Sequence, residues 1–356
     1  MATSLITTVF AMILLTVLPS LRSCTSLGDG TVEHYSTSEP MKFVVGQSGE
    51  EKYTTINEAV AAASMVPEDR RVQIRIRKGV YDEIVIINRT NVELVGDGMG
   101  RTIITGNRRV TPTLGTINTA TVYATKHAVG FTARRITFRN TAGVGEPAVA
   151  LHSGADRSAF YRCRFEGYQD TLYAHAGRQF YRACIIVGTV DFIFGNATAV
   201  FQNTKIFLRS PQPGAVGSGF ITAQSRHDPY DVSGFVLHYC QVWREPGSGP
   251  MNVYLGRPWR TYSRVVFMNT YLDESINPEG WSQWDNNTPI PDTVYYAEYR
   301  NSGPGSETIR RKMWPGYHLL SEDEAMQFTV RRFLLSGEEQ EHWLSAAKVP
   351  FFDGLN

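Results

Sequence analysis

The amino-acid sequence predicts an all-β fold, a solenoid of short parallel strands stacked coil upon coil. Residues 160–163 read FYRC, a similar YRAC follows at 181–184, and a third copy, FQNT, occupies 201–204. A repeat of about 20 residues with short apolar runs indicates coils that each bury a face of the next. The composition agrees, because 31 glycines, 12% aromatic and 19% charged residues suit short strands and tight turns better than long amphipathic helices.

The N-terminal residues 1–26 have the features of a secretory signal peptide. Residues 5–18 form an apolar run too short for a membrane span, and small residues follow near 23–26. We therefore expect a secreted protein, with a polar lead-in at 27–40 and one domain over 41–356. Sequons at Asn88, Asn196 and Asn286 agree with secretion. An uncleaved membrane anchor is the alternative.

The elements of the domain follow from local patterns. Residues 42–45 predict a strand, and Thr55 with Glu58 forms a capping box that begins an Ala-rich helix through about Ala63. We expect this helix to close one end of the solenoid. Residues 96–100, GDGMG, predict a tight turn, since no long helix follows as a phosphate-binding loop would require. Further strand-forming segments are expected at 72–76, 84–86, 92–95, 116–122, 131–138, 148–151, 220–224, 235–240, 265–270 and 295–299, and a helix at 321–332.

Two aspartates occupy equivalent positions in the repeat. Asp170 and Asp191 are 21 residues apart, like the FYRC and YRAC segments. In a parallel solenoid they would lie about 4.8 Å apart, one strand spacing. Two carboxyl groups so close cannot both ionise freely, which leaves a proton donor beside an anion, and the amide of Gln169 is suited to stabilise an oxyanion. The alternative is that both aspartates cap turns between strands.

Four longer motifs accompany these residues. They are GYQDTL at 167–172, GTVDFIFGNA at 188–197, LGRPW at 255–259 and GVYDE at 79–83. Together, in this order, they resemble the signatures of plant pectin methylesterases, and the resemblance covers almost the whole chain after the signal. It implies a right-handed parallel β-helix with a few short capping helices, in the short form that lacks the family's inhibitor-like pro-region.

The resemblance also implies the reaction. It implies a carboxylic ester hydrolase of the plant cell wall that demethylesterifies homogalacturonan pectin, releasing methanol and leaving pectate. By this resemblance Asp191 is expected to be the nucleophile, Asp170 the proton donor and then the base, and Gln169 the transition-state stabiliser. The intermediate would be an acyl-enzyme anhydride.

Substrate-binding roles are implied by the same resemblance. Arg257 is expected to hold Asp191 ionised, as a charge-assisted partner would, and Trp259 and Thr116 are expected to contact the sugar. Without the motif, Arg257 would be a surface ion pair and Trp259 a core residue. Tyr168 and Phe192 flank the two aspartates, and for both of them cleft lining and core packing remain open.

One position departs from the family pattern. The family usually reads QAVAL where this chain reads PAVAL at 147–151, and the family's glutamine helps to stabilise the oxyanion. Pro147 offers neither a side-chain donor nor a backbone N–H, and loss of one oxyanion donor costs on the order of 10²–10³ in rate. The alternative function is a catalytically weakened or inactive pectin-binding relative. A glycoside hydrolase or polysaccharide lyase on a similar solenoid is a second alternative.

The four cysteines contain no C-x-x-C pair, which makes a zinc site improbable. Cys24 would leave with the signal. Cys163 and Cys184 occupy equivalent repeat positions and either form a disulfide or remain buried thiols. In the resembled family a disulfide commonly links the Cys184 position to the place held here by Thr204, so the family's usual bridge is not expected.

Charge and composition limit the kinds of molecule that this protein is expected to bind. A net charge of +1 offers no broad basic surface for nucleic acid. His152, His175 and His238 share no short metal-binding motif, so we expect no metal and no organic cofactor. Methylesterified pectin is the expected partner, and the resemblance adds an inhibitor protein that covers the cleft. We expect a monomer with no membrane attachment after signal removal.

Overall fold

The computed structural model describes residues 39–285, 287–311, 314–335 and 342–355, which belong to the compact unit Ser36–Asn356. The expected signal peptide at 1–26, the lead-in as far as residue 38 and the sequon at Asn286 lie outside the described residues.

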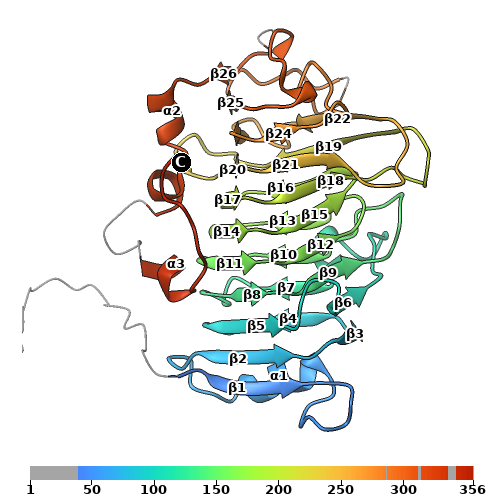
Figure 1. Ribbon diagram of the computed structural model, residues 1–356, viewed down its shortest axis with the longest axis vertical. Helices are drawn as coiled ribbons and strands as arrows, with labels where there is room; N and C mark the ends of the chain where they lie inside the picture. Colours follow the sequence, from blue (N-terminus) through green and yellow to red (C-terminus); the bar gives the residue numbers. More distant parts are fainter. Residues whose placement is uncertain (1–38, 286, 312–313, 336–341, 356) are drawn as a thin grey trace, which may run out of the picture. The chain divides into compact units, whose positions relative to one another are not determined.

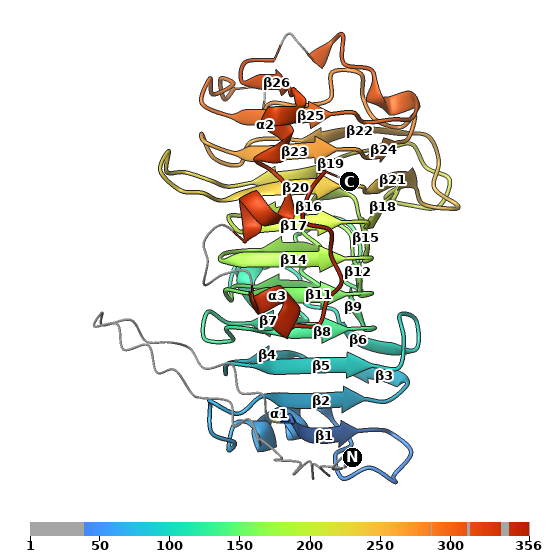
Figure 2. The ribbon, with the colours of Figure 1, turned by 60° about the vertical axis from the view of Figure 1, so that its left-hand side comes forward.

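Successive strands of the chain belong in turn to three parallel sheets, and each strand pairs with its equivalent in the next coil (Figures 1 and 2). Sheet A consists of β1 (Met41–Val45), β2 (Val72–Ile76), β5 (Val92–Gly96), β8 (Thr132–Arg134), β11 (Ser158–Tyr161), β14 (Arg178–Arg182), β17 (Thr198–Gln202), β20 (Gly234–His238), β23 (Arg264–Met268), β25 (Tyr295–Tyr299) and β26 (Tyr317–Leu319). Sheet B consists of β3 (Gly79–Asp82), β6 (Thr102–Gly106), β9 (Thr137–Asn140), β12 (Arg164–Glu166), β15 (Ile185–Gly188), β18 (Lys205–Leu208), β21 (Gln241–Arg244) and β24 (Tyr271–Leu272). Sheet C consists of β4 (Val85–Ile87), β7 (Val122–Ala124), β10 (Leu151–Ser153), β13 (Leu172–Ala174), β16 (Val190–Gly195), β19 (Gly217–Gln224) and β22 (Met251–Gly256). This arrangement is the expected parallel β-helix.

The repeat seen in the sequence corresponds to a ladder of rings inside the solenoid. Phe160 is in register with Tyr181, and Tyr181 with Phe201. Their rings stack with centroid distances of 4.7 and 4.5 Å, and all three side chains are fully buried. Aromatic stacking of this kind adds to the free energy gained by burying the rings, so the repeated aromatic positions help to set the register of neighbouring coils.

In each of seven successive coils, a residue with a left-handed backbone ends the sheet A strand, and in six of them the chain then enters sheet B. These residues directly follow β8, β11, β14, β17, β20, β23 and β25, none is glycine, and their φ angles lie between 47° and 58°: Arg135, Arg162, Ala183, Asn203, Tyr239, Asn269 and Arg300. The conformation costs roughly 1–2 kcal/mol for an L-residue. The hydrogen-bonded coils on either side of each turn hold it in place.

The cysteines at the next position of the repeat are buried thiols. Cys163, Cys184 and Cys240 are all free, so the alternative of a Cys163–Cys184 disulfide is wrong. The backbone N–H of Cys184 donates to the hydroxyl of Thr204 at 3.3 Å. Thr204 therefore stacks on Cys184 as the repeat implies, with a hydrogen bond in place of the family's usual bridge.

The helices confirm one expectation and correct two. Helix α1 (Ile56–Ala63) begins with the capping box of Thr55 and Glu58 and packs against β1 and β2 at the N-terminal end of the solenoid (Figure 1). The helix expected at 321–332 is divided, because Thr329 is extended and its side chain caps a new π-helical turn. The segment 116–122 begins as a 3-10 helix rather than a strand. The remaining helical segments are η1 (Thr116–Thr119), η2 (Pro304–Ser306), α2 (Glu322–Met326), η4 (Val330–Leu334) and α3 (His342–Ala346).

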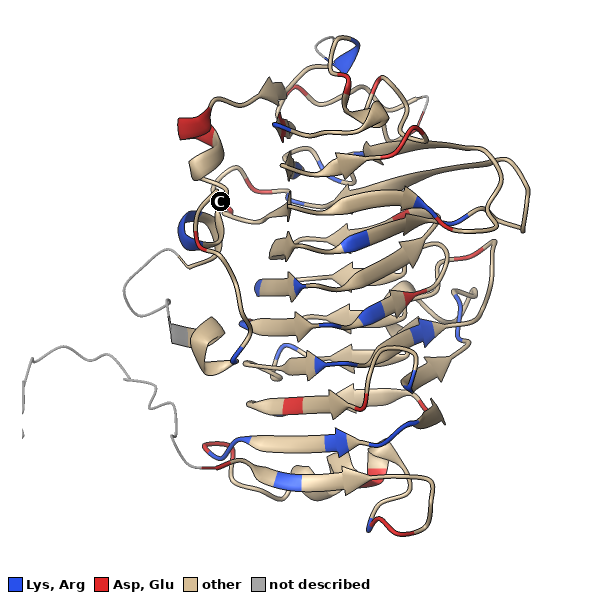
Figure 3. Cartoon of the chain, viewed as in Figure 1, with Lys and Arg blue, Asp and Glu red and all other residues tan. Residues whose placement is uncertain are grey.

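Charged side chains of both signs are spread along the coils rather than gathered on one (Figure 3). Many of them pair across neighbouring strands, as Arg139 does with Glu166 at 3.0 Å. None of the helices in the described ranges is long and apolar enough to cross a membrane.

Candidate active site

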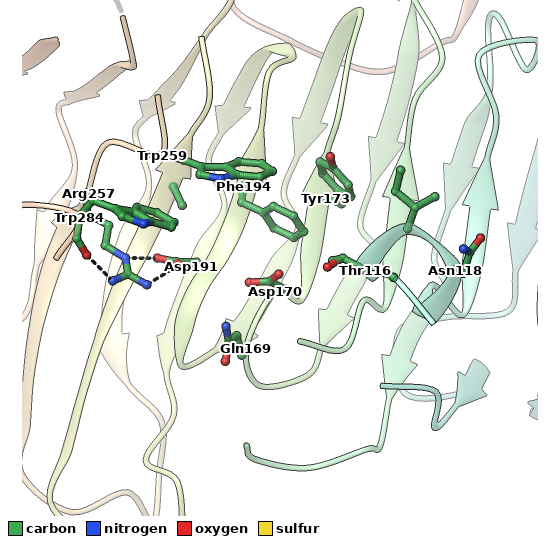
Figure 4. A pocket seen from close by; sticks show the side chains of 13 residues that line it. Thr116, Asn118, Gln169, Asp170, Tyr173, Asp191, Phe194, Arg257, Trp259 and Trp284 are labelled. Carbon is green, nitrogen blue, oxygen red and sulfur yellow. Dashed lines mark hydrogen bonds and ion pairs between the residues drawn. The ribbon is translucent and has the colours of Figure 1, made fainter. Parts of the chain in front are cut away.

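A cavity of about 380 Å³ lies on the outer side of sheet C (Figure 4). Tyr173 and Phe194 line it, while Leu172 and Ile193, their neighbours in the same strands, point into the core. All six site residues expected from the sequence line this cavity: Thr116, Gln169, Asp170, Asp191, Arg257 and Trp259.

The strand register places the two aspartates on neighbouring coils. Tyr173 of β13 is in register with Phe194 of β16, and the backbone N–H of Asp170 donates to the carbonyl of Val190 at 3.1 Å. Asp170 and Asp191 have φ angles of 62° and 51°, so both lie in the left-handed region. A non-glycine residue in that region carries strain that the surrounding structure must offset, and such strain is common at functional sites.

Asp191 is held by Arg257 in a bidentate ion pair. Nε of Arg257 donates to Oδ1 at 2.9 Å and Nη2 donates to Oδ2 at 2.7 Å. Nη1 donates to the carbonyl of Trp284 at 2.9 Å. The guanidinium carbon also lies 4.1 Å from the ring centroid of Phe220 and 4.3 Å from that of Trp284. Two aromatic faces and three hydrogen bonds therefore fix the orientation of Arg257 toward Asp191.

The two carboxyl groups are therefore electrostatically different. Burial and the neighbouring charge of Asp191 raise the pKa of Asp170 well above the ordinary value, and Arg257 opposes this rise. Burial also raises the pKa of Asp191, but there the hydrogen bonds and the charge of Arg257 oppose the rise directly. Because Arg257 binds both oxygens of Asp191, we assign the anion to Asp191 and the proton to Asp170.

The floor of the cavity is aromatic. The rings of Tyr173 and Phe194 stack at 4.2 Å, and Trp259 lies 6.0 Å from Phe194 and 6.4 Å from Tyr173. Gln169 points its amide toward the same space as Asp170 (Figure 4). A carboxyl pair and an amide thus line one cavity together with these three aromatic rings.

The sequence did not identify several of the residues that line this cavity. Tyr173 and Phe194 have the same 21-residue offset as the aspartates, so the repeat would have found them. Asn118 follows Thr116 in η1, and Trp284 comes from a loop with no repeat partner. No sequence signal pointed to Trp284 at this place.

The two flanking aromatics lie outside the cavity. Phe192 is fully buried in the core, because a register irregularity between Val190 and Ile193 interrupts the alternation of β16. Tyr168 lines a different hollow, beside Arg209. Core packing is therefore correct for Phe192, and cleft lining is wrong for both residues.

Pro147 lies near the site without lining the cavity. The next residue, Ala148, donates its N–H to the carbonyl of Gln169 at 3.2 Å, and the carbonyl of Pro147 accepts from Val110 at 2.9 Å. Pro147 is absent from the described residues that line the cavity. These contacts place it beside the Gln169 loop, and they give no support to the alternative of an inactive protein.

No group of three or more metal-ligating side chains occurs in the part of the chain that the structure describes. His152 and His175 lie close, with Nε2 and Nδ1 2.9 Å apart. Burial and the nearby His175 lower the pKa of His152 to about 3, which keeps its ring neutral.

Comparisons with known proteins agree with this geometry. The pectinesterase family model matches residues 42–338. Pectinesterase 2 of Citrus sinensis is 48% identical over 325 residues, which cover 90% of this chain and 62% of that protein. The chain thus spans less than two thirds of the length of that relative.

Two solved structures share the fold. The carrot pectin methylesterase has a TM-score of 0.80 at 43% identity, with 90% of this chain and 99% of that one covered. The Aspergillus niger pectin methylesterase has a TM-score of 0.73 at 32% identity, with 87% and 98% covered. The family match, the sequence identity and the shared fold together show that this chain belongs to the pectinesterase family.

Proposed function

We propose that this protein hydrolyses the methyl esters of galacturonate units in pectin, releasing methanol. The observation that carries the proposal is the pair of buried carboxyl groups in one cavity, of which Asp191 alone is paired with Arg257. One carboxylate is thereby kept as a nucleophile and its neighbour as an acid, which ester hydrolysis through an acyl-enzyme requires.

In the first half of the proposed reaction, an oxygen of Asp191 attacks the carbonyl carbon of the methyl ester. The carbonyl electron pair moves onto oxygen and forms a tetrahedral oxyanion, to which Gln169 donates a hydrogen bond. Collapse of this oxyanion breaks the bond to the methoxy oxygen, which takes the proton of Asp170 and leaves as methanol. An anhydride then joins Asp191 to the galacturonate.

In the second half, the ionised Asp170 removes a proton from a water molecule, whose oxygen attacks the galacturonate carbonyl. Collapse of the second tetrahedral intermediate breaks the bond to Asp191, restores its carboxylate and frees the intact pectin chain, whose galacturonate unit now carries an unesterified carboxyl group. Asp170 ends protonated, ready for the next cycle. We further propose that Trp259 stacks on a sugar ring and that Thr116 contacts it from the opposite side of Asp170 (Figure 4).

Methanol release from highly methylesterified pectin tests the proposal, with the wild-type protein, Asp191→Ala and Asp82→Ala compared. Asp82 is an exposed aspartate of β3, so its variant controls for the loss of an acidic side chain. We expect turnover by the wild type and Asp82→Ala but not by Asp191→Ala, and no new reducing ends. Turnover by Asp191→Ala, or chain cleavage in place of methanol release, would contradict the esterase mechanism.

We propose that the mature protein acts as a monomer in the plant cell wall, where an inhibitor protein binds over the cleft.

Of the two described sequons, Asn88 is the better glycan site. Asn88 is exposed, whereas Asn196 already donates from Nδ2, the atom that would carry the glycan, to Asp231 at 2.9 Å. Expression in plant cells should yield secreted protein whose glycosidase-sensitive mass shift disappears in Asn88→Gln. A shift lost only in Asn196→Gln would reverse the assignment.

A further inference from the structure

We propose that Arg209 is a positioning residue that holds the Gln169–Asp170 loop from a hollow separate from the active-site cavity. The inference rests on the proposed esterase function. Arg209 and Tyr168 line a hollow of about 420 Å³, and no residue that lines this hollow also lines the active-site cavity. Arg209 is therefore placed to act on the catalytic residues only through the loop that carries them.

Arg209 touches both residues that precede Gln169. Its Nη1 donates to the carbonyl of Gly167 at 2.9 Å, and its guanidinium carbon lies 5.0 Å from the ring centroid of Tyr168. A hydrogen bond to the backbone and a cation–π contact to the next side chain restrain the loop at two successive positions.

Two carboxylates fix the orientation of the guanidinium. Glu245 accepts from Nε at 2.7 Å and from Nη2 at 2.8 Å, and Glu166 accepts from Nη2 at 3.2 Å. The backbone N–H of Arg209 also donates to the carbonyl of Gly188 at 3.0 Å. Because hydrogen bonds restrain both its backbone and its planar guanidinium group, Arg209 is a rigid support for the loop.

A second restraint holds the loop from inside. The hydroxyl of Thr171, which is fully buried, lies 3.1 Å from the carbonyl of Tyr168 and 3.1 Å from that of Val187. Between these inner and outer restraints, Asp170 keeps its left-handed φ of 62°. A strained residue of this kind persists only where its surroundings over-determine it, so loss of the outer restraint should let Asp170 move away from Asp191.

Arg209 differs in this respect from the other arginines of its cluster. Glu166 also accepts hydrogen bonds from Arg139 at 3.0 Å and from Arg164 at 3.3 Å, so its charge stays compensated without Arg209. Neither Arg139 nor Arg164 has a described hydrogen bond to the backbone of residues 167–170. Arg139→Met therefore removes one positively charged partner of Glu166 but leaves the contacts of the Gln169–Asp170 loop in place. This variant is the matched control.

The first test compares Arg209→Met, Arg209→Lys and Arg139→Met in steady-state methanol release. Calorimetric titration with a de-esterified oligogalacturonate gives the fraction of binding-competent protein, to which kcat is normalised. We expect Arg209→Met to lower the normalised kcat by about 10- to 100-fold, since a displacement near 1 Å costs up to this much. Arg209→Lys should recover part of the loss, and KM and the control's kcat should change by less than about twofold. An unchanged normalised kcat in Arg209→Met, or an equal loss in Arg139→Met, would overturn the proposal.

The second test does not depend on activity. Hydrogen exchange of a peptide spanning residues 167–172 reports the loop directly, since the Asp170 N–H is bonded to Val190 in the folded state. We expect exchange to be about tenfold faster in Arg209→Met than in the wild type. In Arg139→Met the exchange rate should not change. If the wild type releases no methanol, the proposed function fails whatever the exchange result. If exchange is unchanged in Arg209→Met, the loop restraint fails whatever the activity.

Discussion

Asp170 and Asp191 are the same position in two successive coils, yet their surroundings differ. Both have a left-handed backbone, and both line the same cavity. Both are also buried, with Asp170 9% and Asp191 4% exposed. Asp191 has a bidentate arginine partner, whereas Asp170 has no such partner among the described residues, and burial together with the charge of Asp191 raises its pKa.

This comparison separates what a repeat supplies from what its surroundings supply. The solenoid places two identical carboxyl groups at equivalent positions of neighbouring coils. The segment that follows β22 then brings Arg257 to one of them, and the loop that carries Trp284 fixes that arginine. The division into nucleophile and acid therefore comes from elements outside the two equivalent coils.

The largest expected effect is loss of the nucleophile. Asp191→Asn keeps the shape of the side chain but cannot form the anhydride, so methanol release should fall by on the order of 10⁴ or more. The measurement is kcat on methylesterified pectin, with circular dichroism as the check that the variant is folded. If Asp191→Asn retained more activity than Asp170→Asn, the roles of the two aspartates would be reversed.

Loss of the acid should cost less and should change the pH dependence. Asp170→Asn removes the proton donor and the later base, for which we expect a 10²–10⁴-fold fall in kcat. In the wild type, the raised pKa of Asp170 keeps its proton above the pH at which an ordinary aspartate ionises. Activity should decline as pH rises through that pKa, and the alkaline limb of the kcat profile should be absent in Asp170→Asn. An unchanged alkaline limb would assign it to another group.

Removing the partner that distinguishes the two aspartates should have an intermediate effect. Arg257→Met withdraws a charge that lowers the pKa of both Asp191 and Asp170. Both pKa values should rise, so the whole pH profile should move to higher pH, and kcat should fall by about 10²-fold at the wild-type optimum. Arg260→Met, a neighbouring arginine outside the cavity lining, is the matched control. A shift toward lower pH would contradict the assigned role of Arg257.

The smallest effect is expected at Pro147. Because Gln169 already faces the cavity and Pro147 does not line it, Pro147→Gln should raise kcat by less than about tenfold, although an oxyanion donor elsewhere is worth more. Methanol release by both proteins under identical conditions measures the ratio. An inactive wild type beside an active Pro147→Gln would restore the interpretation of a pectin-binding relative.

The sequence alone was sufficient for the parallel stacking of coils and for six of the residues that line the cavity. The 21-residue offset specifies which residues lie above one another, because equivalent positions in a parallel solenoid must be neighbours. The capping box of α1 was equally local, since it needs only Thr55 and Glu58. The LGRPW motif then singled out Arg257 and Trp259, and the wider family resemblance added Thr116.

Only the tertiary structure decided which way several side chains point and what covers them. The left-handed Asp191 interrupts the alternation of β16, so Phe192 enters the core. Arg257 lies between Phe220 and Trp284, and Arg209 reaches back to Gly167. A repeat period fixes neighbours along the stack. It leaves open the local backbone irregularities and the contacts made by loops distant in sequence, and these set the charge and the position of each catalytic group.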